Sequence, residues 1–374
     1  MKIVFVLTYS PDPRLVKRIR TFLKYGFEVE LIFAERTHSL SRFLANSLPR
    51  IYTLKYRDSN NLPTRLYDLI GFITKVNNII KTVNPKLIYT CGFDGLMTAS
   101  LCQWHKGAFL IYEVSDMPGG RWYERKLYRQ LINTLEKVFI RHVDKIVLTS
   151  PHFNQEGKYD KYKSKIMILE NLPEKRLFAK YMKMNHEDFT VGYFGLVRDK
   201  RAMETLIRAL GNLDGIKVLI AGKGLEPAYK DIVELGTNHN NVEFRGPFNY
   251  ENDIVNLYSS VDSVYSVYGC DNENTNLALG NKLYEAIACK LPILVTKGSK
   301  MGDFVESNGI GFTVRPDNPD DVKRAVLRMV KDKNLVNEIA DRCESLWVRC
   351  FYETVEEKFM TKINGALVRG IKSK

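Results

Sequence analysis

The sequence predicts an α/β protein made of two doubly wound domains that face each other across a cleft. Three observations support this prediction. Short runs rich in Val and Ile alternate with longer amphipathic stretches, which is typical of parallel sheets with helices on both faces. The alternation weakens once, near residue 180. The length of 374 residues and a hydrophobic content of 45% suit a globular chain of two domains.

The first series of elements predicts an N-terminal Rossmann-like domain over residues 1–180. It opens with the strand KIVFVL (2–7), a helix over 15–25 with apolar residues at helical spacing, and the strand EVELIFA (28–34). Gly26 ends the helix. The later strands are expected at 86–90, 108–114 and 145–150, with helices at 64–83, 94–104 and 122–141.

The second series predicts another Rossmann-like domain over residues 181–345. Its strands are expected at 190–195, 216–222, 242–246, 263–268, 292–296 and 311–314, and its helices at 202–213, 226–235, 251–260, 281–289 and 319–331. A long amphipathic helical pattern then runs from Glu344 to Leu367. In open α/β sheets, ligands bind outside the carboxyl ends of the strands, so we expect the functional residues in the loops there.

Composition excludes several classes of protein. The six cysteines show no metal-ligand spacing, and no apolar run approaches the roughly 18 residues that a membrane-spanning helix needs. We therefore expect a cytoplasmic protein without a metal site.

The net charge differs between the two halves of the chain. Residues 1–180 hold 30 Lys and Arg against 16 Asp and Glu, a net charge of +14, whereas residues 181–374 carry −1. This asymmetry indicates an anionic partner or a merely solvated basic surface. No nucleic-acid-binding module is present, so we expect no nucleic acid partner.

Three glycine-bearing loops of the second half could hold an anion. Gly195 ends a strand, and Arg198, Lys200 and Arg201 follow it at the start of a helix, where backbone N–H groups already favour negative charge. The alternative is a solvated charge cluster. Gly222 ends the next strand. Gly246 ends the one after it and is followed by Phe248, which could cover a base or fill a turn. The chain has neither a P-loop nor a G-x-G-x-x-G in its first βα turn.

The stretch GNKLYEAIACKLPILV (280–295) places Lys282 and Glu285 on one face of a helix start. Lys282 could hold phosphate oxygens, and the Glu285 carboxylate could accept hydrogen bonds from a sugar diol. A local salt bridge worth a few tenths of a kcal/mol is the alternative.

These loops together resemble the C-terminal half of the retaining GT-B glycosyltransferases of family 4. The resemblance rests on VGYFGLVRDKRAMETLIRAL, KVLIAGKG, VEFRGPF and GNKLYEAIACKLPILV, with VFIRHVDKIVLTSPHF as a weaker N-terminal match. It implies a GT-B fold whose last helix, about 346–374, packs back on the first domain. It also implies a nucleoside-diphosphate sugar as donor, no cofactor, and side-chain cations in place of a metal to balance the leaving diphosphate.

The resemblance also assigns donor-binding residues. Lys200 matches a family lysine, Arg198 replaces an arginine that normally follows the glycine, and Lys282 with Asn281 would contact phosphate. Glu285 matches the second of two glutamates eight apart and would bind the ribose. The first is missing, since Leu277 stands there. The donor-binding set is Gly195, Arg198, Lys200, Gly222, Gly246, Phe248, Asn281, Lys282 and Glu285.

The acceptor is expected in the first domain, in the polar loop after strand 108–114. Glu113 or Asp116 could orient its hydroxyl, and they complete the catalytic set with Arg198 and Lys200. Asp116 could instead cap the following helix, and Asp12 and Arg14 are further candidates. The expected function is retaining sugar transfer to a glycan or lipid-linked acceptor in cell-surface polysaccharide synthesis. Peripheral contact with the anionic inner membrane face is expected through Trp122, Tyr123 and the basic residues to Arg129. The alternatives are a nucleotide-sugar epimerase and a non-catalytic nucleotide-sugar-binding protein.

Overall fold

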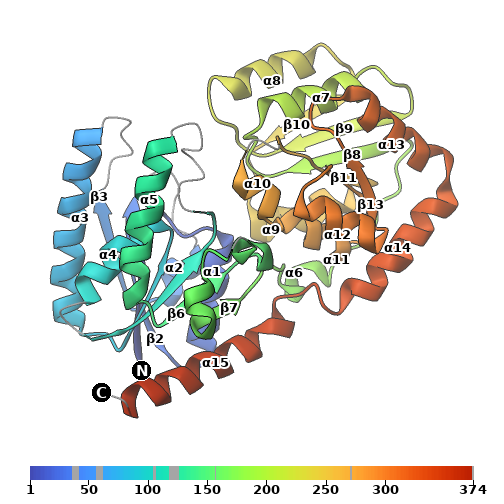
Figure 1. The fold of residues 1–374 in the computed structure, drawn as a ribbon. Coiled ribbons are helices and arrows are strands. Elements are labelled where there is room, and N and C mark those ends of the chain that lie inside the picture. The colour runs from blue at the N-terminus through green and yellow to red at the C-terminus, as the bar shows by residue number, and fades with distance from the viewer. Residues whose placement is uncertain are drawn as a thin grey trace. The chain divides into compact units, whose positions relative to one another are not determined.

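The computed structural model describes residues 1–35, 42–55, 62–103, 107–117, 126–155, 157–269 and 272–372. The chain divides into two compact units (Figure 1). Unit 1 comprises Met1–Glu170 and Glu356–Lys374, and unit 2 comprises Asn171–Val355. The division after Glu170 falls ten residues before the expected join at 180.

Unit 1 is built on a seven-stranded parallel sheet in the order β3-β2-β1-β4-β5-β6-β7. The strands are β1 (Lys2–Leu7), β2 (Glu28–Glu35), β3 (Arg50–Lys55), β4 (Leu87–Cys91), β5 (Phe109–Val114), β6 (Lys145–Leu148) and β7 (Ile166–Ile168). The central strands β1, β4 and β5 are apolar along almost their whole length because helices cover both faces of the sheet.

Right-handed crossovers place the helices of unit 1 on two faces. Since the chain moves one way along the sheet from β1 to β3 and the other way from β4 to β7, α1 and α2 lie on one face and α3, α4 and α5 on the other (Figure 1). The helices are α1 (Pro13–Lys24), α2 (Arg42–Ser47), α3 (Leu62–Val83), α4 (Phe93–Gln103), α5 (Lys126–Phe139) and the returning α15 (Glu353–Lys372). Short 3-10 turns η2 (Ile140–His142), η3 (Pro151–Asn154) and η4 (Asp160–Lys165) flank β6 and β7.

Unit 2 is built on a six-stranded parallel sheet in the order β10-β9-β8-β11-β12-β13. The strands are β8 (Phe189–Phe194), β9 (Ile216–Ala221), β10 (Val242–Gly246), β11 (Ser263–Ser266), β12 (Ile293–Thr296) and β13 (Gly311–Val314). The helices are α6 (Lys175–Phe178), α7 (Lys200–Leu210), α8 (Ala228–Thr237), α9 (Tyr250–Ser259), α10 (Glu273–Leu277), α11 (Asn281–Ala288), α12 (Lys300–Asn308), α13 (Pro319–Lys331) and α14 (Lys333–Trp347).

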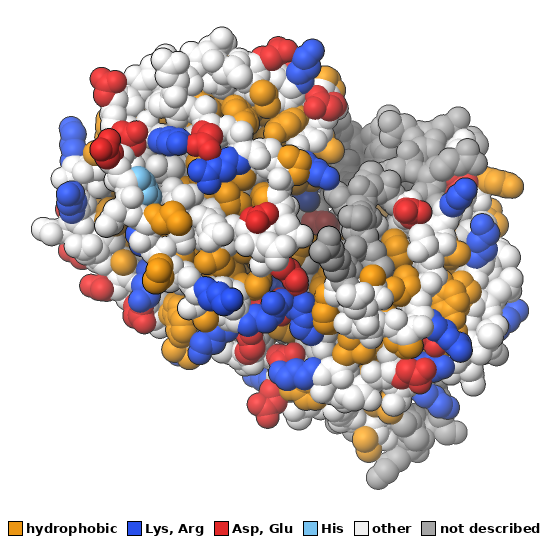
Figure 2. All heavy atoms as spheres, turned by 180° about the vertical axis from the view of Figure 1, so that it is seen from behind, with side chains coloured by type: hydrophobic (Ala, Val, Ile, Leu, Met, Phe, Trp, Pro, Cys, Tyr) orange, Lys and Arg blue, Asp and Glu red, His pale blue; other side chains and the backbone are white. Residues whose placement is uncertain are grey.

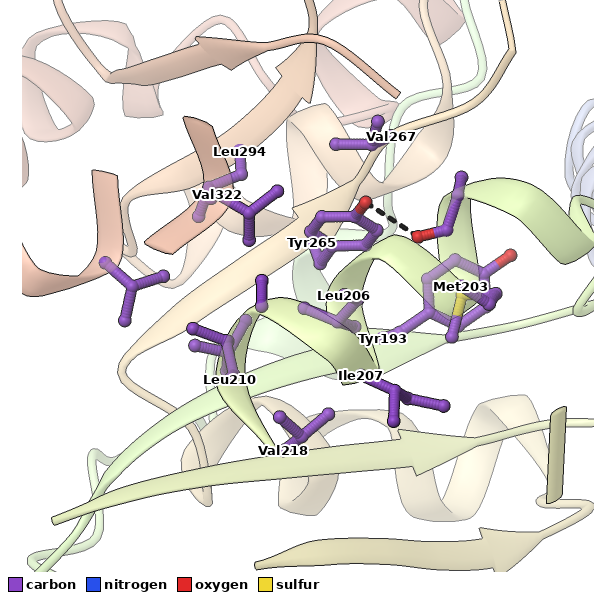
Figure 3. Close-up of a cluster of buried hydrophobic side chains, with 14 of the residues drawn as sticks. Tyr193, Met203, Leu206, Ile207, Leu210, Val218, Tyr265, Val267, Leu294 and Val322 are labelled. Atoms are coloured by element: carbon purple, nitrogen blue, oxygen red, sulfur yellow. Dashed lines mark hydrogen bonds between the residues drawn. The ribbon is translucent and has the colours of Figure 1, made fainter. Parts of the chain in front are cut away.

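A core of buried hydrophobic side chains supports the loops of unit 2 (Figure 3). Helix α7 contributes Met203, Leu206, Ile207 and Leu210, at the i, i+3, i+4 and i+7 spacing of a buried helical stripe. Tyr265 of β11 lies in the same core, and its hydroxyl donates to the Ala202 carbonyl oxygen at 2.9 Å. This bond ties the first turn of α7 to the central strand, so the loop before α7 starts from a rigid base.

The C-terminal amphipathic pattern was expected to be one helix, but the structure divides it at residues 348–352 into α14 and α15. Trp347, at the end of α14, donates to the Ala288 carbonyl oxygen at 3.2 Å within unit 2. Phe359 of α15 packs edge-on against Phe22 of α1 within unit 1. The single apolar pattern therefore supplies two separate cores, and the chain bends where it passes from one to the other.

The view from behind shows Lys and Arg side chains intermingled with Asp and Glu on the surface of both units (Figure 2). On the side seen there, the described Lys and Arg side chains therefore form no purely basic patch. Among the described residues, no helix combines the length and the apolar character needed to cross a bilayer.

Candidate functional site

The site in unit 2 lies where the strand order reverses. The chain runs from β8 outward to β9 and β10, and then returns to place β11 on the other side of β8. The loops after β8 and β11 therefore diverge at the carboxyl edge of the sheet, which is the usual position of a ligand in such folds. The Asp199 carboxylate joins the two loops, because it accepts from the Gly269 N–H at 2.5 Å.

The predicted glycines form the base of this site on neighbouring strand ends. The Gly222 N–H donates to the Gly246 carbonyl oxygen at 2.7 Å, and the Gly195 N–H donates to the Ala221 carbonyl oxygen at 2.9 Å. Gly222 has φ +148°, and a β-carbon there would lie 1.7 Å from the Gly195 carbonyl oxygen. Only glycine lets the two backbones approach so closely.

Lys282 lies over the point where the strand order reverses. Its ammonium donates to the Tyr268 hydroxyl at 2.6 Å and lies 4.5 Å from the centre of the Tyr193 ring. A β-carbon built at Gly195 would be 3.6 Å from Lys282 Nζ, which places the cation beside the glycine at the end of β8. The structure thus brings Lys282 and Gly195 together, 87 residues apart in sequence, as an anion site requires.

The two tyrosines around Lys282 differ in acidity. Burial opposes ionisation of Tyr268, but the charge of Lys282 and its hydrogen bond outweigh burial and hold the Tyr268 pKa below its ordinary value. Burial, together with the neighbouring Tyr268, raises the pKa of Tyr193 well above its ordinary value. Tyr193 instead donates to the Leu196 carbonyl oxygen at 2.7 Å, which holds the loop after β8 in place.

Helix α7 begins with an anionic cap that the sequence reasoning did not include. Asp199 is its N-cap residue and accepts from the Ala202 N–H at 3.0 Å, in addition to its bond to Gly269. The sequence predicted only the cations of this loop as functional and not Asp199, although Asp before a helix is a standard capping signal. The cap relieves part of the conflict between the basic first turn and the helix dipole.

The other two predicted cations are less closely tied to this site. The Lys200 ammonium lies 2.5 Å from the Asp231 carboxylate of α8 and 3.7 Å from Glu204. Its hydrogen bond to Asp231 raises its pKa. Arg198 is exposed, and its charge offsets only a small part of the rise that burial causes in the Tyr193 pKa. Their role in donor binding stays a prediction.

Glu285 is buried behind the site. Its two carboxylate oxygens accept from the hydroxyls of Tyr250 (2.5 Å) and Tyr258 (2.7 Å) of α9. Burial, reinforced by the Glu285 carboxylate, raises the pKa of both tyrosines well above the ordinary value, so they stay donors. A ribose at Glu285 would have to share the carboxylate with Tyr250 or displace it.

Asn281 and Phe248 occupy the edges of this region. Asn281 is the first residue of α11, and its side-chain oxygen accepts from Asn171. Phe248 is half-buried between β10 and α9. Their contacts with a donor stay predictions.

Unit 1 has a corresponding reversal of strand order between β1 and β4. Arg14 of α1 lies there, with Nη2 2.9 Å from the Asp12 carboxylate and 3.7 Å from Cys91 Sγ, and with Nη1 3.0 Å from the Glu113 carboxylate. The Tyr9 hydroxyl also donates to Cys91 Sγ at 3.3 Å. Asp12 and Arg14 are therefore central to this edge of the sheet.

Glu113 and Asp116, the predicted acceptor residues, have different surroundings. The Glu113 side chain is fully buried, 3.1 Å from Arg18 Nε and hydrogen-bonded by the Tyr89 hydroxyl. Burial alone would raise its pKa, but the charges of Arg18 and Arg14 outweigh burial and hold the pKa below its ordinary value. Each Glu113 oxygen is therefore buried beside an arginine, away from solvent. Asp116 is exposed, and the role of both residues toward an acceptor stays a prediction.

Two further predictions concern regions that the structure covers in part. Half of the basic and aromatic segment from Trp122 to Arg129, residues 122–125, lies outside the described residues. Among those described, no group of three or more His, Cys, Asp and Glu side chains could hold a metal ion.

Residues 188–332 match the family model described as Glycosyl transferases group 1. A crystal structure of HepE from Anabaena in complex with UDP and glucose is similar at a TM-score of 0.74 and 16% identity, covering 97% of this chain and 99% of that chain. Sucrose-phosphate synthase from Thermosynechococcus elongatus is similar at 0.74 and 13%, covering 99% and 100%. A UDP-N-acetylglucosamine 2-epimerase is similar at 0.61 and 11%, covering 91% and 90%. No curated protein sequence matches the chain.

The two parallel sheets and these structural matches define the GT-B fold, so the predicted fold class is confirmed. Residues 188–332, less than half of the chain, match the group 1 glycosyltransferase model, and the structural matches at 11–16% identity show the fold. The narrower assignment to family 4 stays a prediction.

Proposed function

We propose that the chain moves a sugar from a nucleoside-diphosphate sugar to a glycan or lipid-linked acceptor with retention of configuration, in the cytoplasm and at the inner membrane face. The observation that carries the proposal is Lys282 beside Gly195. A half-buried cation, held by Tyr268 over a glycine base, is what a diphosphate needs at this edge of a sheet. HepE, which has the same fold, binds UDP and glucose.

In this mechanism the diphosphate lies against the ends of β8 and β9, where Gly195 lies beside Lys282 and Gly222 lets the two backbones approach closely. Negative charge develops on the departing phosphate, and Lys282 is already in place to stabilise it before the bond breaks. Arg198, exposed on the loop after β8, would supply a second cation, and Lys200 would do so after leaving Asp231. In unit 1, Arg14 is preorganised by Glu113 beside the loop that would orient the acceptor hydroxyl.

The proposal includes a role in cell-surface polysaccharide synthesis. Its support is the charge of the first 180 residues, +14, which attracts anionic lipid or a lipid-linked diphosphate acceptor. Of the alternatives, an epimerase is the less similar structure, at 0.61 against 0.74. An epimerase would release or convert the donor with no acceptor present.

A thermal-shift panel of UDP, GDP, ADP and CDP tests the donor site. The bound nucleotide should raise the melting temperature, because a ligand at 100 times its Kd stabilises the folded state by about 2.7 kcal/mol. Lys282→Met removes a charged hydrogen-bond donor worth about 1.5–3 kcal/mol, so affinity should fall roughly tenfold to a hundredfold. Lys290→Met is the matched control, since Lys290 follows the same helix but pairs with Glu344 on the surface.

An equal shift in wild type and Lys282→Met, or no shift with any nucleotide, would refute the donor site. If a nucleotide binds, the corresponding sugar nucleotides are tested for turnover with and without an acceptor extract. Nucleotide binding without turnover under any condition would favour the non-catalytic alternative. Turnover that needs no acceptor would favour the epimerase.

A further inference from the structure

Asp12 is a partly exposed carboxylate at the carboxyl edge of unit 1. It follows β1 and is the N-cap residue of α1, at the point where the strand order reverses between β1 and β4. Its side chain is 40% exposed, whereas the side chains of its charged neighbours Arg14 and Glu113 are 8% and 0% exposed. Of these three charged groups, Asp12 is therefore the one that a ligand can reach.

Both oxygens of the Asp12 carboxylate are held in place. Oδ1 accepts from the Leu15 N–H at 2.9 Å, which caps α1, and Oδ2 accepts from Arg14 Nη2 at 2.9 Å. A carboxylate offers about four lone-pair sites, so roughly two remain for a further donor. The carboxylate is thus fixed in orientation and is still able to accept a hydrogen bond from a hydroxyl.

The capping role alone does not account for this arrangement. Asn and Ser cap a helix about as well as Asp, and a cap needs only one oxygen. The second oxygen of Asp12 is bound by Arg14, whose Nη1 lies 3.0 Å from the buried Glu113 carboxylate. Burying an arginine and a glutamate is costly unless their geometry is good. Here the buried pair fixes the side chain of Asp12, as supporting hydrogen bonds do for a residue that must hold a substrate in a productive orientation.

The charge state of Asp12 suits orientation of a hydroxyl better than removal of its proton. Partial burial opposes ionisation, but the charge of Arg14 and the hydrogen bond from Leu15 outweigh burial and hold the Asp12 pKa below its ordinary value. Asp12 is therefore ionised at neutral pH and only accepts hydrogen bonds. A base works best when its pKa lies near the working pH, so Asp12 is a poor base. In the transfer, the acceptor oxygen bonds to the anomeric carbon, the bond from that carbon to the phosphate oxygen breaks, and the hydroxyl proton leaves with the diphosphate.

We propose that Asp12 orients the acceptor hydroxyl, and that Glu113 is a positioning residue that acts on Asp12 through Arg14. This inference rests on the proposed function in assuming a hydroxyl acceptor at this edge of unit 1. Glu113, which the sequence predicted to contact the acceptor directly, instead lies behind the residue that makes the contact.

Asp12→Asn and Asp12→Ser test the role of the carboxylate, because both variants keep a helix cap and remove the charge. The probes are octyl glycosides of common hexoses, offered as acceptors together with the sugar nucleotide that the chain turns over. Each variant should lower kcat/KM for the glycoside roughly tenfold to a hundredfold, the loss expected for a hydrogen bond to a charged group. KM for the sugar nucleotide and the nucleotide-induced shift in melting temperature should be unchanged.

Asp144→Asn is the matched control in the same unit. Asp144 is also half-buried and also accepts from a backbone N–H, that of Leu110 at 2.8 Å, but it directly precedes β6 and so lies at the amino edge of the sheet. Its replacement should leave kcat/KM for the glycoside unchanged. Glu113→Gln should lower kcat/KM less than Asp12→Asn does, and the double variant should be no slower than Asp12→Asn alone, because Glu113 acts through the same carboxylate.

Unchanged glycoside turnover in both Asp12 variants, or an equal loss in Asp144→Asn, would overturn the proposal. A loss confined to Asp116→Asn would also overturn it and would give the acceptor to the loop after β5. Saturation-transfer NMR with the same glycosides separates this proposal from the donor site. Glycoside signals that are present with wild type and lost with both Asp12 variants would support the role of Asp12 even if no nucleotide raised the melting temperature, a result that would refute the donor site. A nucleotide-induced shift with neither glycoside signals nor glycoside turnover would leave the donor site standing and overturn the role of Asp12.

Discussion

Replacing Glu113 by Gln separates a structural role for this residue from a catalytic one. Glu113 and Arg18 are both fully buried, and Arg14 is 7% exposed, so Gln would remove the Glu113 counter-charge from two arginines of the interior, of which Arg14 keeps its ion pair with Asp12. Removing one partner of a buried ion pair typically costs about 3–5 kcal/mol. Gln retains an oxygen that can accept from Arg18, so we expect a loss of about 3 kcal/mol in the stability of unit 1.

Hydrogen–deuterium exchange read by mass spectrometry measures the two units separately. A loss of about 3 kcal/mol should speed exchange of β4 and β5 amides roughly a hundredfold, because 1.4 kcal/mol is a factor of ten. Peptides of β8 and β9 should be unchanged, and so should the nucleotide-induced shift. Glu28→Gln is the control: Glu28 pairs with Lys2 on the surface, so β4 and β5 should exchange as in wild type.

The reasoning fails if Glu113→Gln leaves exchange in β4 and β5 unchanged. If turnover were lost at the same time, Glu113 would act directly on the acceptor, as the sequence reasoning supposed.

Three further outcomes are expected. The pKa of Glu113 in the folded protein lies below its ordinary value of 4.5. The ionised Glu113 therefore stabilises the fold above pH 4.5, and this stabilisation is lost as the pH falls through the folded pKa. The urea midpoints of wild type and Glu113→Gln should differ at pH 7 and converge under acid conditions. Gly222→Ala should abolish nucleotide binding or unfold unit 2, because its methyl group would overlap a backbone carbonyl. Gly298→Ala, at φ +79° but in open space, should cost only about 1–2 kcal/mol; equal melting temperatures for the two variants would contradict this. Lys282→Met should raise the pKa of Tyr268, seen as an upward shift of one phenol in absorbance titration, and a titration curve identical to wild type would exclude their contact.

The local pattern predicted the central strands well and the peripheral ones poorly. Strands such as 2–7 and 108–114 are buried on both faces, so their sequences are continuously apolar. β3, over Arg50–Lys55, lies at the sheet edge with only partly buried side chains, and β7 has three residues. Neither carries enough apolar signal to stand out, and both were missed.

The candidate site was predictable as a set of loops but not as a set of contacts. The glycines at 195, 222 and 246 were found because each ends an apolar strand, and Lys282 because it opens a helix. Tyr268 carried a usable signal, an aromatic residue at the end of a strand before a glycine, and was overlooked. Nothing in the local pattern shows that Lys200 faces Asp231, or that Glu285 is held by Tyr250 and Tyr258.

The sequence by itself determined the alternation of strands and helices, the two-part architecture and the loops that end at the carboxyl edges. These features depend on the period of the apolar residues and on glycine, which act over a few neighbouring positions. Only the tertiary structure decided which of the predicted charges meet. Strand order places Lys282 beside Gly195 and buries Glu113 between Arg14 and Arg18, because pairing in a sheet joins segments tens of residues apart whose side chains carry no mark of their partners.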